Sequence, residues 1–184
     1  MLMCCDLPSF CVKYRPNGRD KWNMRDIQVD DMIGADGCCR VKSGNSHVIC
    51  SLYGPRGGRQ RYKLSGVVDV FIRFPVLRDN GFCSSQEDMQ KIVCCCLDEV
   101  IVLDKYPSLE ISVCIQILHD GGSIISTCVM SALIAAQSAG IEMNCHSPLG
   151  MCVSRFVGGG LIPSLCQEGD LICDCDEEEE ASQV

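Results

Sequence analysis

The sequence predicts a mixed α+β fold, because segments with the two-residue period of a strand alternate along it with segments that have the period of a helix. Residues 46–53 and 67–74 are rich in β-branched and aromatic side chains and are bounded by glycine and proline. Residues 109–118 alternate between apolar and polar side chains, whereas residues 85–103 place apolar side chains on one helical stripe. We therefore expect a half-buried sheet covered by helices.

The elements follow one another in a simple order. The predicted strand 46–53 is followed by a flexible loop over residues 54–63 and by the predicted strand 67–74. In the helix predicted over residues 85–103, the apolar side chains recur at the spacing of successive helical turns. They are Met89, Ile92, Val93, Cys96, Leu97, Val100 and Ile101.

The second half of the chain begins with the alternating strand over residues 109–118, which ends at a turn over residues 119–123. The small apolar side chains of residues 124–139 predict a helix packed closely on the sheet, closed by Gly140. A further strand is expected over residues 150–157, before a run of three glycines.

Composition places this chain among folded globular proteins. Its 184 residues are 47% hydrophobic and 22% charged, which suits one domain with a sizeable core and excludes disorder over most of the length. No apolar run approaches the roughly 20 residues of a membrane-spanning helix, and no export signal is recognisable at the start. We expect a soluble intracellular protein without a membrane partner.

The net charge of −8 comes from the C-terminal end of the chain. Residues 1–166 balance their basic and acidic side chains, and every later charge is negative. These later acids are Glu168, Asp170, Asp174, Asp176, Glu177, Glu178, Glu179 and Glu180. The sequence thus divides into a polar N-terminal arm (1–34), a domain (35–166) and an acidic, disordered tail (167–184).

The chain contains 17 cysteines, an odd number at irregular spacing. Without an export signal, this pattern argues against a disulfide framework and favours reduced cysteines that act as small hydrophobic core residues. Cys114, Cys128 and Cys152 lie where an apolar core residue is expected. The pair Cys173 and Cys175 is too small a set to hold a metal ion alone.

The predicted loop at 54–63 carries four positive charges in a basic first third of the chain. They are Arg56, Arg59, Arg61 and Lys63. Arginine binds phosphate through its planar fork, so these four residues are the candidate RNA-binding site, to which Arg40 and Lys42 would add. A solvated hairpin loop without a ligand is an equal alternative, because the neighbouring glycines leave the arginines unconstrained.

The turn Asp120-Gly121-Gly122-Ser123 precedes a predicted helix, whose first N–H groups could face an anion. We favour a purely structural strand-to-helix turn that needs glycine at positive φ, since Ile124 and Ile125 follow and offer no charge to a phosphate. His47, His119 and His146 form no recognisable catalytic arrangement. We therefore predict no catalytic residue, no metal site and no cofactor.

Several short motifs occur in the order typical of one family. They are Tyr14-Arg15-Pro16-Asn17-Gly18-Arg19, Arg25-Asp26-Ile27, Ala35-Asp36-Gly37, Gly44-Asn45-Ser46, Tyr53-Gly54-Pro55, Tyr106-Pro107, Ile115-Gln116-Ile117-Leu118 before Asp120-Gly121-Gly122, and Ala139-Gly140-Ile141. Over residues 14–166 the chain resembles RNase PH-like proteins. The resemblance implies an RNase PH-like (ribosomal protein S5 domain 2-like) sheet with packed helices, truncated at its C-terminal end.

The departures from the family pattern bear on activity. RNase PH enzymes have a Gly-Gly-Thr-Arg segment whose threonine and arginine hold the attacking phosphate, and Ser123 and Ile124 stand at those two positions. The acidic pair of the family would lie beyond the three glycines at 158–160 and is not found. The resemblance therefore implies an inactive homologue, because phosphorolysis depends on electrostatic stabilisation of the phosphoryl oxygens.

Within the family, the chain resembles the RNase PH-like subunits of the eukaryotic exosome ring. The short connection between residues 70–73 and 85–87 favours component five, whereas Arg15 and Arg19 in the arm are closer to component four. The resemblance implies a structural ring subunit that supports 3′–5′ RNA processing and degradation. Its expected partners are RNA, RNase PH-like neighbours and cap proteins, in the nucleus, nucleolus and cytoplasm.

Two alternatives stay open. One is an active phosphate-dependent 3′–5′ exoribonuclease whose catalytic groups come from a partner chain, and the other is a degraded homologue without a role in assembly.

Overall fold

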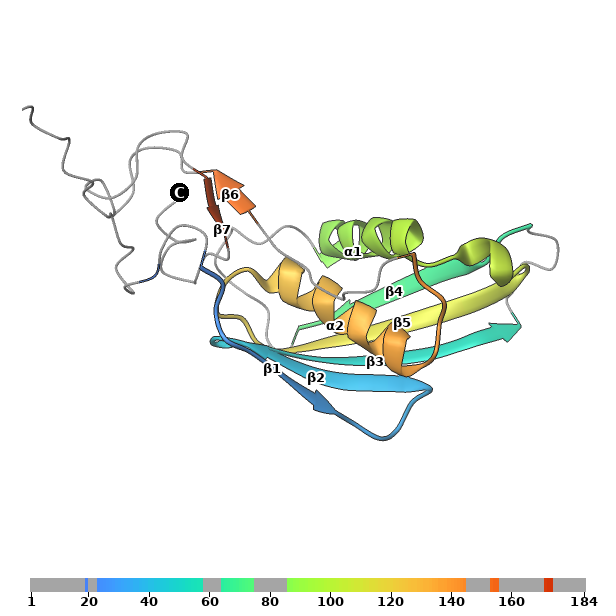
Figure 1. Cartoon of the computed structure of the whole chain (residues 1–184), viewed down its shortest axis with the longest axis horizontal. Helices are drawn as coiled ribbons and strands as arrows, with labels where there is room; N and C mark the ends of the chain where they lie inside the picture. The colour runs from blue at the N-terminus through green and yellow to red at the C-terminus, as the bar shows by residue number, and fades with distance from the viewer. Residues whose placement is uncertain are drawn as a thin grey trace, which may run out of the picture.

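A five-stranded sheet with two helices on one face forms the body of the protein (Figure 1). The computed structural model describes residues 19, 23–57, 64–74 and 86–144 and the backbone of two short strands further on. The sheet contains β1 (Ile27–Asp31), β2 (Gly37–Ser43), β3 (Ser46–Gly57), β4 (Val67–Arg73) and β5 (Leu109–His119). These elements confirm the predicted α+β class.

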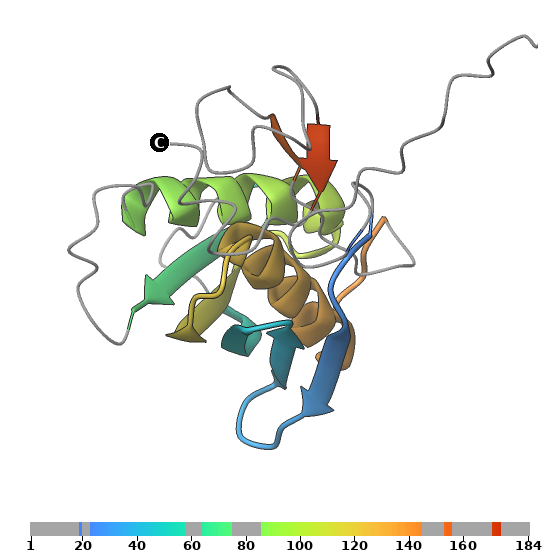
Figure 2. The same cartoon turned by 90° about the vertical axis from the view of Figure 1, so that its left-hand side faces the viewer.

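The strands lie in the order β1-β2-β3-β5-β4, and all pairs are antiparallel except β4 with β5. Parallel neighbours need a crossover connection, which here is made by α1 (Gln86–Val100) and the short 3₁₀ helix η1 (Leu103–Lys105). The second helix, α2 (Ile124–Ser138), follows β5. Both helices lie on the same side of the sheet (Figure 2).

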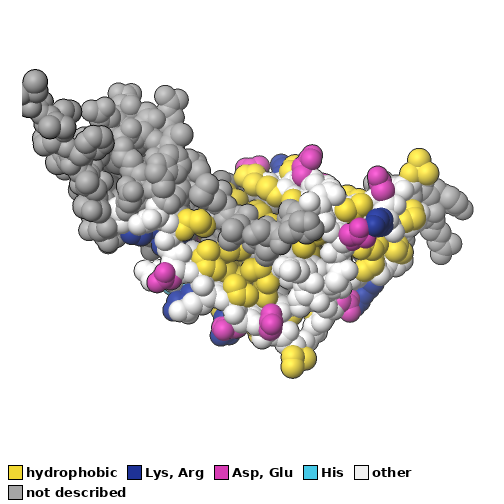
Figure 3. All heavy atoms as spheres, viewed as in Figure 1, with side chains coloured by type: hydrophobic (Ala, Val, Ile, Leu, Met, Phe, Trp, Pro, Cys, Tyr) yellow, Lys and Arg dark blue, Asp and Glu magenta, His cyan; other side chains and the backbone are white. Residues whose placement is uncertain are grey.

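The two helices bury different amounts of surface. In α1 only a narrow stripe of Met89, Val93 and Leu97 is buried, while Ile92 on the predicted stripe is 41% exposed. In α2 most side chains are buried, which fits its uniformly apolar sequence. The helix ends as predicted before Gly140, which has φ +71°. In the view of Figure 3, hydrophobic side chains gather over α2 and charged ones lie toward the rim.

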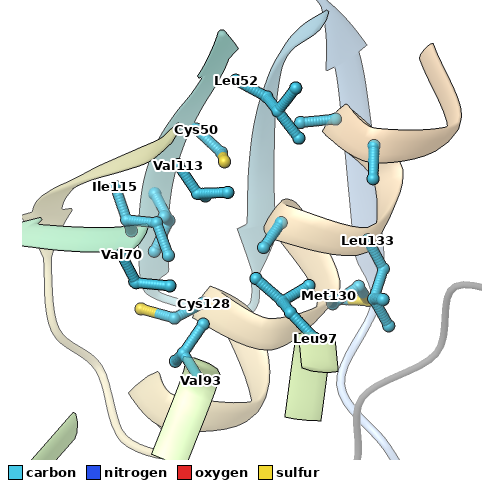
Figure 4. Close-up of a cluster of buried hydrophobic side chains, with 14 of the residues drawn as sticks. Cys50, Leu52, Val70, Val93, Leu97, Val113, Ile115, Cys128, Met130 and Leu133 are labelled. Carbon is cyan, nitrogen blue, oxygen red and sulfur yellow. The ribbon is translucent and has the colours of Figure 1, made fainter. Parts of the chain in front are cut away.

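The core lies between the sheet and the helices. Alternate residues of β3 and β5 point into it, among them Leu52 and Val113, where they meet Val93 and Leu97 of α1 and Met130 of α2 (Figure 4). Each large aliphatic side chain buried in this way contributes about 1.5–3 kcal/mol. The predicted alternation of residues 109–118 is therefore confirmed.

The cysteines behave partly as predicted. Cys38, Cys39, Cys50 and Cys128 are free and buried, as expected of small hydrophobic side chains. The prediction was wrong for Cys114, which is exposed because its side chain lies on the opposite face of β5 from the core residues Val113 and Ile115. Cys152 lies outside the described residues.

The first strands were not predicted. Residues 27–31 were assigned to an irregular arm but form β1, and residues 37–43 form β2. The sequence IQVDD of β1 is a poor strand on its own, and it is held by antiparallel pairing with β2. Whether an arm ends at residue 34 stays a prediction.

Two short strands near the end of the chain form a second, two-stranded sheet. β6 (Val153–Arg155) lies within the strand predicted over residues 150–157, and it pairs with β7 (Leu171–Cys173). Residues 171–173 were predicted as part of a disordered tail, and for them that prediction was wrong, because their backbone pairs with β6. None of the helices in the described part of the chain is long and apolar enough to cross a membrane.

Candidate functional site

The turn between β5 and α2 is held by a guanidinium group from the start of the sheet. Arg25 donates from Nη1 to the carbonyl of Gly121 at 2.6 Å and from Nη2 to the carbonyl of Gly122 at 2.8 Å. Charge-assisted fork contacts of this kind fix both position and orientation. The cation of Arg25 therefore binds backbone oxygens of the turn.

A buried hydroxyl completes the contact between this turn and the β2–β3 hairpin. Ser46, which is fully buried, accepts a hydrogen bond from the N–H of Gly121 at 3.1 Å and donates one to the carbonyl of Gly122 at 2.7 Å. A Cβ on Gly121 would lie only 2.5 Å from that of Asn45, so glycine is required there. The two N–H groups of the glycines are already bonded, to Ser46 and to Asp120.

These contacts agree with the structural interpretation of the turn. Gly122 has φ +89° and Ser123 has φ +49°, a left-handed backbone conformation. Ser123 makes no side-chain cap for α2. Ile124, at the position of the family's phosphate-binding arginine, is only 6% exposed and belongs to the hydrophobic core. This corner thus presents no cation from the first turn of α2.

The predicted RNA-binding residues lie only partly within the described chain. Arg56 was predicted to lie in a flexible loop, and for this residue the prediction is wrong. It lies near the end of β3, which extends to Gly57. Its guanidinium forms an ion pair with Asp36 at 3.1 Å and lies 5.3 Å from the ring centroid of Tyr53. Arg59, Arg61 and Lys63 lie outside the described residues.

Asp36 links this strand end to the loop before β2. Its Oδ2 atom accepts a hydrogen bond from the backbone N–H of Gly54 at 2.8 Å. This bond, together with the nearby Arg56, lowers the pKa of the Asp36 carboxyl against a smaller opposing effect of burial. Arg56 is therefore partly neutralised within the protein.

A second group of cations lies at the opposite end of the sheet, on the face away from the helices. Arg40 and Lys42 are exposed on β2, and Lys42 lies directly opposite His47 of β3. His47 in turn lies opposite His119 of β5, with their ring centroids 6.2 Å apart. Partial burial, and then the charges of Lys42, His119 and Arg40, lower the pKa of His47.

Sequence reasoning treated Arg40 and Lys42 only as additions to the loop and assigned no role to His47 or His119. The register places Arg40 and Lys42 near the β2–β3 turn, whereas Arg56 lies at the other end of β3. The structure therefore does not bring these cations together into one site. Strand pairing was the missing signal, since it is not visible in the spacing of residues along the chain.

Within the part of the chain that the structure describes, no group of three or more His, Cys, Asp or Glu side chains is arranged to hold a metal ion.

Known proteins share both sequence and fold with this chain. Residues 23–142 match the model of the 3′ exoribonuclease family, domain 1 (RNase PH). An exosome complex component Rrp41 of Pyrobaculum calidifontis is 31% identical over 141 residues, covering 70% of this chain and 57% of that protein. The Exosome complex component RRP41-like protein of Arabidopsis thaliana is 28% identical over 138 residues, covering 70% and 53%.

The solved structures support the fold assignment. Rice Rrp46 superposes with a TM-score of 0.75 at 18% identity, covering 92% of this chain and 77% of that one. A chain of the Archaeoglobus fulgidus exosome with RNA bound to its active site gives a TM-score of 0.66 at 18% identity, covering 93% and 74%.

The chain spans between 53% and 62% of the length of the curated relatives it matches first. The matched segment nevertheless includes all five strands of the sheet and both helices that cover it. Since the family model matches well over half of the sequence, this chain belongs to the 3′ exoribonuclease (RNase PH) family.

Proposed function

We propose that this protein is a non-catalytic structural subunit of the exosome core ring, supporting 3′–5′ RNA processing and degradation, ribosomal RNA included, by nucleases associated with the ring. The observation that carries the proposal is the burial of Ile124. The resemblance to active RNase PH enzymes assigns a phosphate-binding arginine to this position, and an isoleucine packed in the core cannot neutralise a phosphate.

The neighbouring cation does not replace the missing one. Arg25 lies at the same turn, but two of its guanidinium nitrogens donate to the carbonyls of Gly121 and Gly122. Withdrawing the guanidinium to bind phosphate would leave those contacts unmade, at a cost of about 1.5–3 kcal/mol for each hydrogen bond to a charged group. The geometry thus supports a structural role for Arg25.

An assay for phosphorolysis tests the inactive part of the proposal. The purified full chain is incubated with single-stranded RNA and inorganic phosphate, and released nucleoside diphosphates are measured, with an active archaeal ring as the positive control. We expect no release above background. Phosphate-dependent release that is lost in Asp120→Asn, in a variant that remains folded, would instead establish the active exoribonuclease.

The proposed partners are the other subunits of the ring, namely RNase PH-like neighbours and cap proteins. Support comes from membership of the family and from the curated relatives, which are named as exosome components. Affinity purification of the tagged full chain from its own cells tests this part. Recovery of ring subunits in comparable amounts is expected, whereas a chain that co-purifies with none of them would favour the degraded homologue.

Among the ring subunits, we place the protein with component five rather than component four, because of the short connection between residues 70–73 and 85–87. The curated relatives reported above are named Rrp41 and the rice structure is Rrp46, so the neighbours recovered in the purification decide the assignment. The proposed location is the nucleus and nucleolus, with a cytoplasmic fraction, which microscopy of the tagged chain would test.

A further inference from the structure

The face of the sheet opposite the helices, which we name the open face, is not covered by any described helix or strand (Figure 2). Its side chains alternate with those of the core along each strand. Arg40 and Lys42 point to this face from β2, since Cys39 and Val41, which alternate with them, are fully buried. Phe71 and Arg73 point to it from β4, since Val70 and Ile72 are buried.

Strand register brings the basic side chains of this face to one end of the sheet. Lys42, His47 and His119 lie side by side across β2, β3 and β5. Arg40 pairs with Ile49, which pairs with Gln116, which in turn lies beside Arg73 of β4. We name Arg40, Lys42 and Arg73, together with the neighbouring imidazoles of His47 and His119, the cationic end of the open face.

The main cations of this end form no ion pair within the described residues. Asp30 of β1 lies opposite Arg40, yet no ion pair joins Arg40, Lys42 or Arg73 to another residue that the structure describes. By contrast, Arg56 at the other end of the sheet is paired with Asp36. Repulsion among unpaired like charges is relieved by an anionic ligand, so this end is the better site for one.

An aromatic ring lies next to one of these cations, Arg73. Phe71 is 50% exposed and neighbours Arg73 on the same face of β4. A large exposed ring gains nothing from water, and a nucleobase can stack on it. Sheet faces that combine exposed aromatic rings with basic side chains are one of the recurrent surfaces for single-stranded RNA.

We propose that the open face binds single-stranded RNA, with Arg40 and Lys42 holding successive phosphates and Phe71 stacking on a base. Arg40 and Lys42 are two residues apart on β2, which separates their Cα atoms by about 7 Å. Such a spacing suits neighbouring phosphates of an extended strand. The inference deepens the proposed function, on which it rests, by locating an RNA contact away from the Gly121–Gly122 turn.

The test is a titration of a labelled 20-mer of oligouridine with the full chain, followed by fluorescence anisotropy at several salt concentrations. Losing two phosphate contacts makes the slope of log K against log salt shallower by about 1.4 and weakens binding on the order of 20-fold at 0.1 M salt. We expect this result for Arg40→Gln with Lys42→Gln. Phe71→Leu should weaken binding about fivefold and leave the salt slope unchanged.

The matched control removes two positive charges elsewhere. Lys91 lies on α1 beside Asp88, and Lys105 in η1 contacts Glu142, both on exposed surface. The double variant Lys91→Gln with Lys105→Gln has the same net charge as the test variant and should bind RNA like the unmodified chain. An equal loss in both double variants would overturn the proposal, since it would reflect net charge alone.

Further outcomes separate this inference from the proposed function. If the unmodified chain joins the ring but Arg40→Gln with Lys42→Gln binds RNA normally, the open-face site is wrong and the ring role stands. If that variant instead fails to join the ring while RNA binding is unchanged, the face is a protein interface, which also overturns the site. A chain that binds RNA through this face but recovers no ring subunits would refute the ring role alone.

Discussion

Cys94 and Cys95 are neighbours on α1, yet their environments differ sharply. Burial, reinforced by the carboxylate of Asp98, raises the pKa of the Cys94 thiol to about 11, and its Sγ lies 3.5 Å from the carbonyl of Val68. Cys95 is exposed. Deeper in the core, burial raises the pKa of Cys39 to about 12.

These environments predict an order of alkylation. Because the thiolate is the reactive form, Cys94 should react with iodoacetamide at pH 8 at least about tenfold more slowly than Cys95. Raising the pH toward 11 should accelerate Cys94 more than a thiol of ordinary pKa. Tandem mass spectrometry of the peptide that contains both residues measures the two rates.

Unfolding the protein provides the control for the predicted order of alkylation of Cys94 and Cys95. In concentrated urea both side chains should react at similar rates, and Asp98→Asn should bring Cys94 closer to Cys95 in the folded chain. Equal rates for the two thiols in the native protein would contradict the packing described for α1.

At the level of single residues, sequence reasoning succeeded where the local pattern decides and failed where distant segments meet. The alternation of β5 correctly assigned Ile111, Val113 and Ile115 to the core. The contact of Arg25 with Gly121 joins residues 96 positions apart, and no local pattern specifies it. For the same reason, the ion pair of Arg56 with Asp36 could not be foreseen, although Asp36 belongs to a recognised motif and Arg56 directly follows one.

At the scale of elements, α2 approaches the sheet very closely at Gly37. A Cβ built on Gly37 would lie 2.0 Å from the carbonyl oxygen of Ala135 and 2.9 Å from the Cβ of Ala139. Backbone atoms of α2 cannot move away without lifting the helix from β2. The absence of a side chain at Gly37 therefore sets the distance between these two elements.

Gly37→Ala should accordingly destabilise the protein. Overpacking against a backbone atom costs about 3 kcal/mol, which lowers the melting temperature by roughly 6–12 °C for a chain of this size. Thermal unfolding followed by circular dichroism measures the change. Gly57→Ala is the matched control, because a Cβ on Gly57 meets nothing within 4 Å. Equal melting temperatures for the two variants would mean that α2 does not approach β2 so closely.

Helices and strands could be predicted from the sequence where a local pattern of residues specifies them. The ranges of β4, β5, α1 and α2 follow from periodicity and from glycine or proline boundaries, and the structure confirms them with small shifts at the ends. β1 lacks such a signal, since its five residues include two aspartates and gain their order from β2. The strand β3 extends past the Gly54–Pro55 pair that was expected to end it.

For the whole molecule, charge is distributed very unevenly along the sequence. The net charge of −8 arises beyond residue 166, while the proposed RNA site is positive. Carboxylates joined to the same chain compete with phosphate for cations and repel an approaching polyanion. The tail should therefore slow RNA association, and the effect should depend strongly on salt.

Replacing the tail carboxylates by amides tests this expectation. The changes are Asp174→Asn, Asp176→Asn, Glu177→Gln, Glu178→Gln, Glu179→Gln and Glu180→Gln. At 0.05 M salt, stopped-flow measurements with labelled RNA should show association a few-fold faster, on the order of threefold, and near 1 M salt the two rates should converge as screening shortens to about 3 Å. Rates that differ equally at both salt concentrations would exclude an electrostatic cause.

The position of β5 also has a consequence during synthesis on the ribosome. β3 and β4 follow one another in sequence but never pair, because β5 lies between them and is made last. At translation speeds of roughly 5–20 residues per second, the interval between completing β3 and completing β5 lasts roughly 3–12 s. During that interval the hairpin of β2 and β3 exposes the unpaired backbone N–H and C=O groups of β3 that will later pair with β5. A chaperone that binds nascent chains at the ribosomal exit tunnel could bind this exposed strand edge.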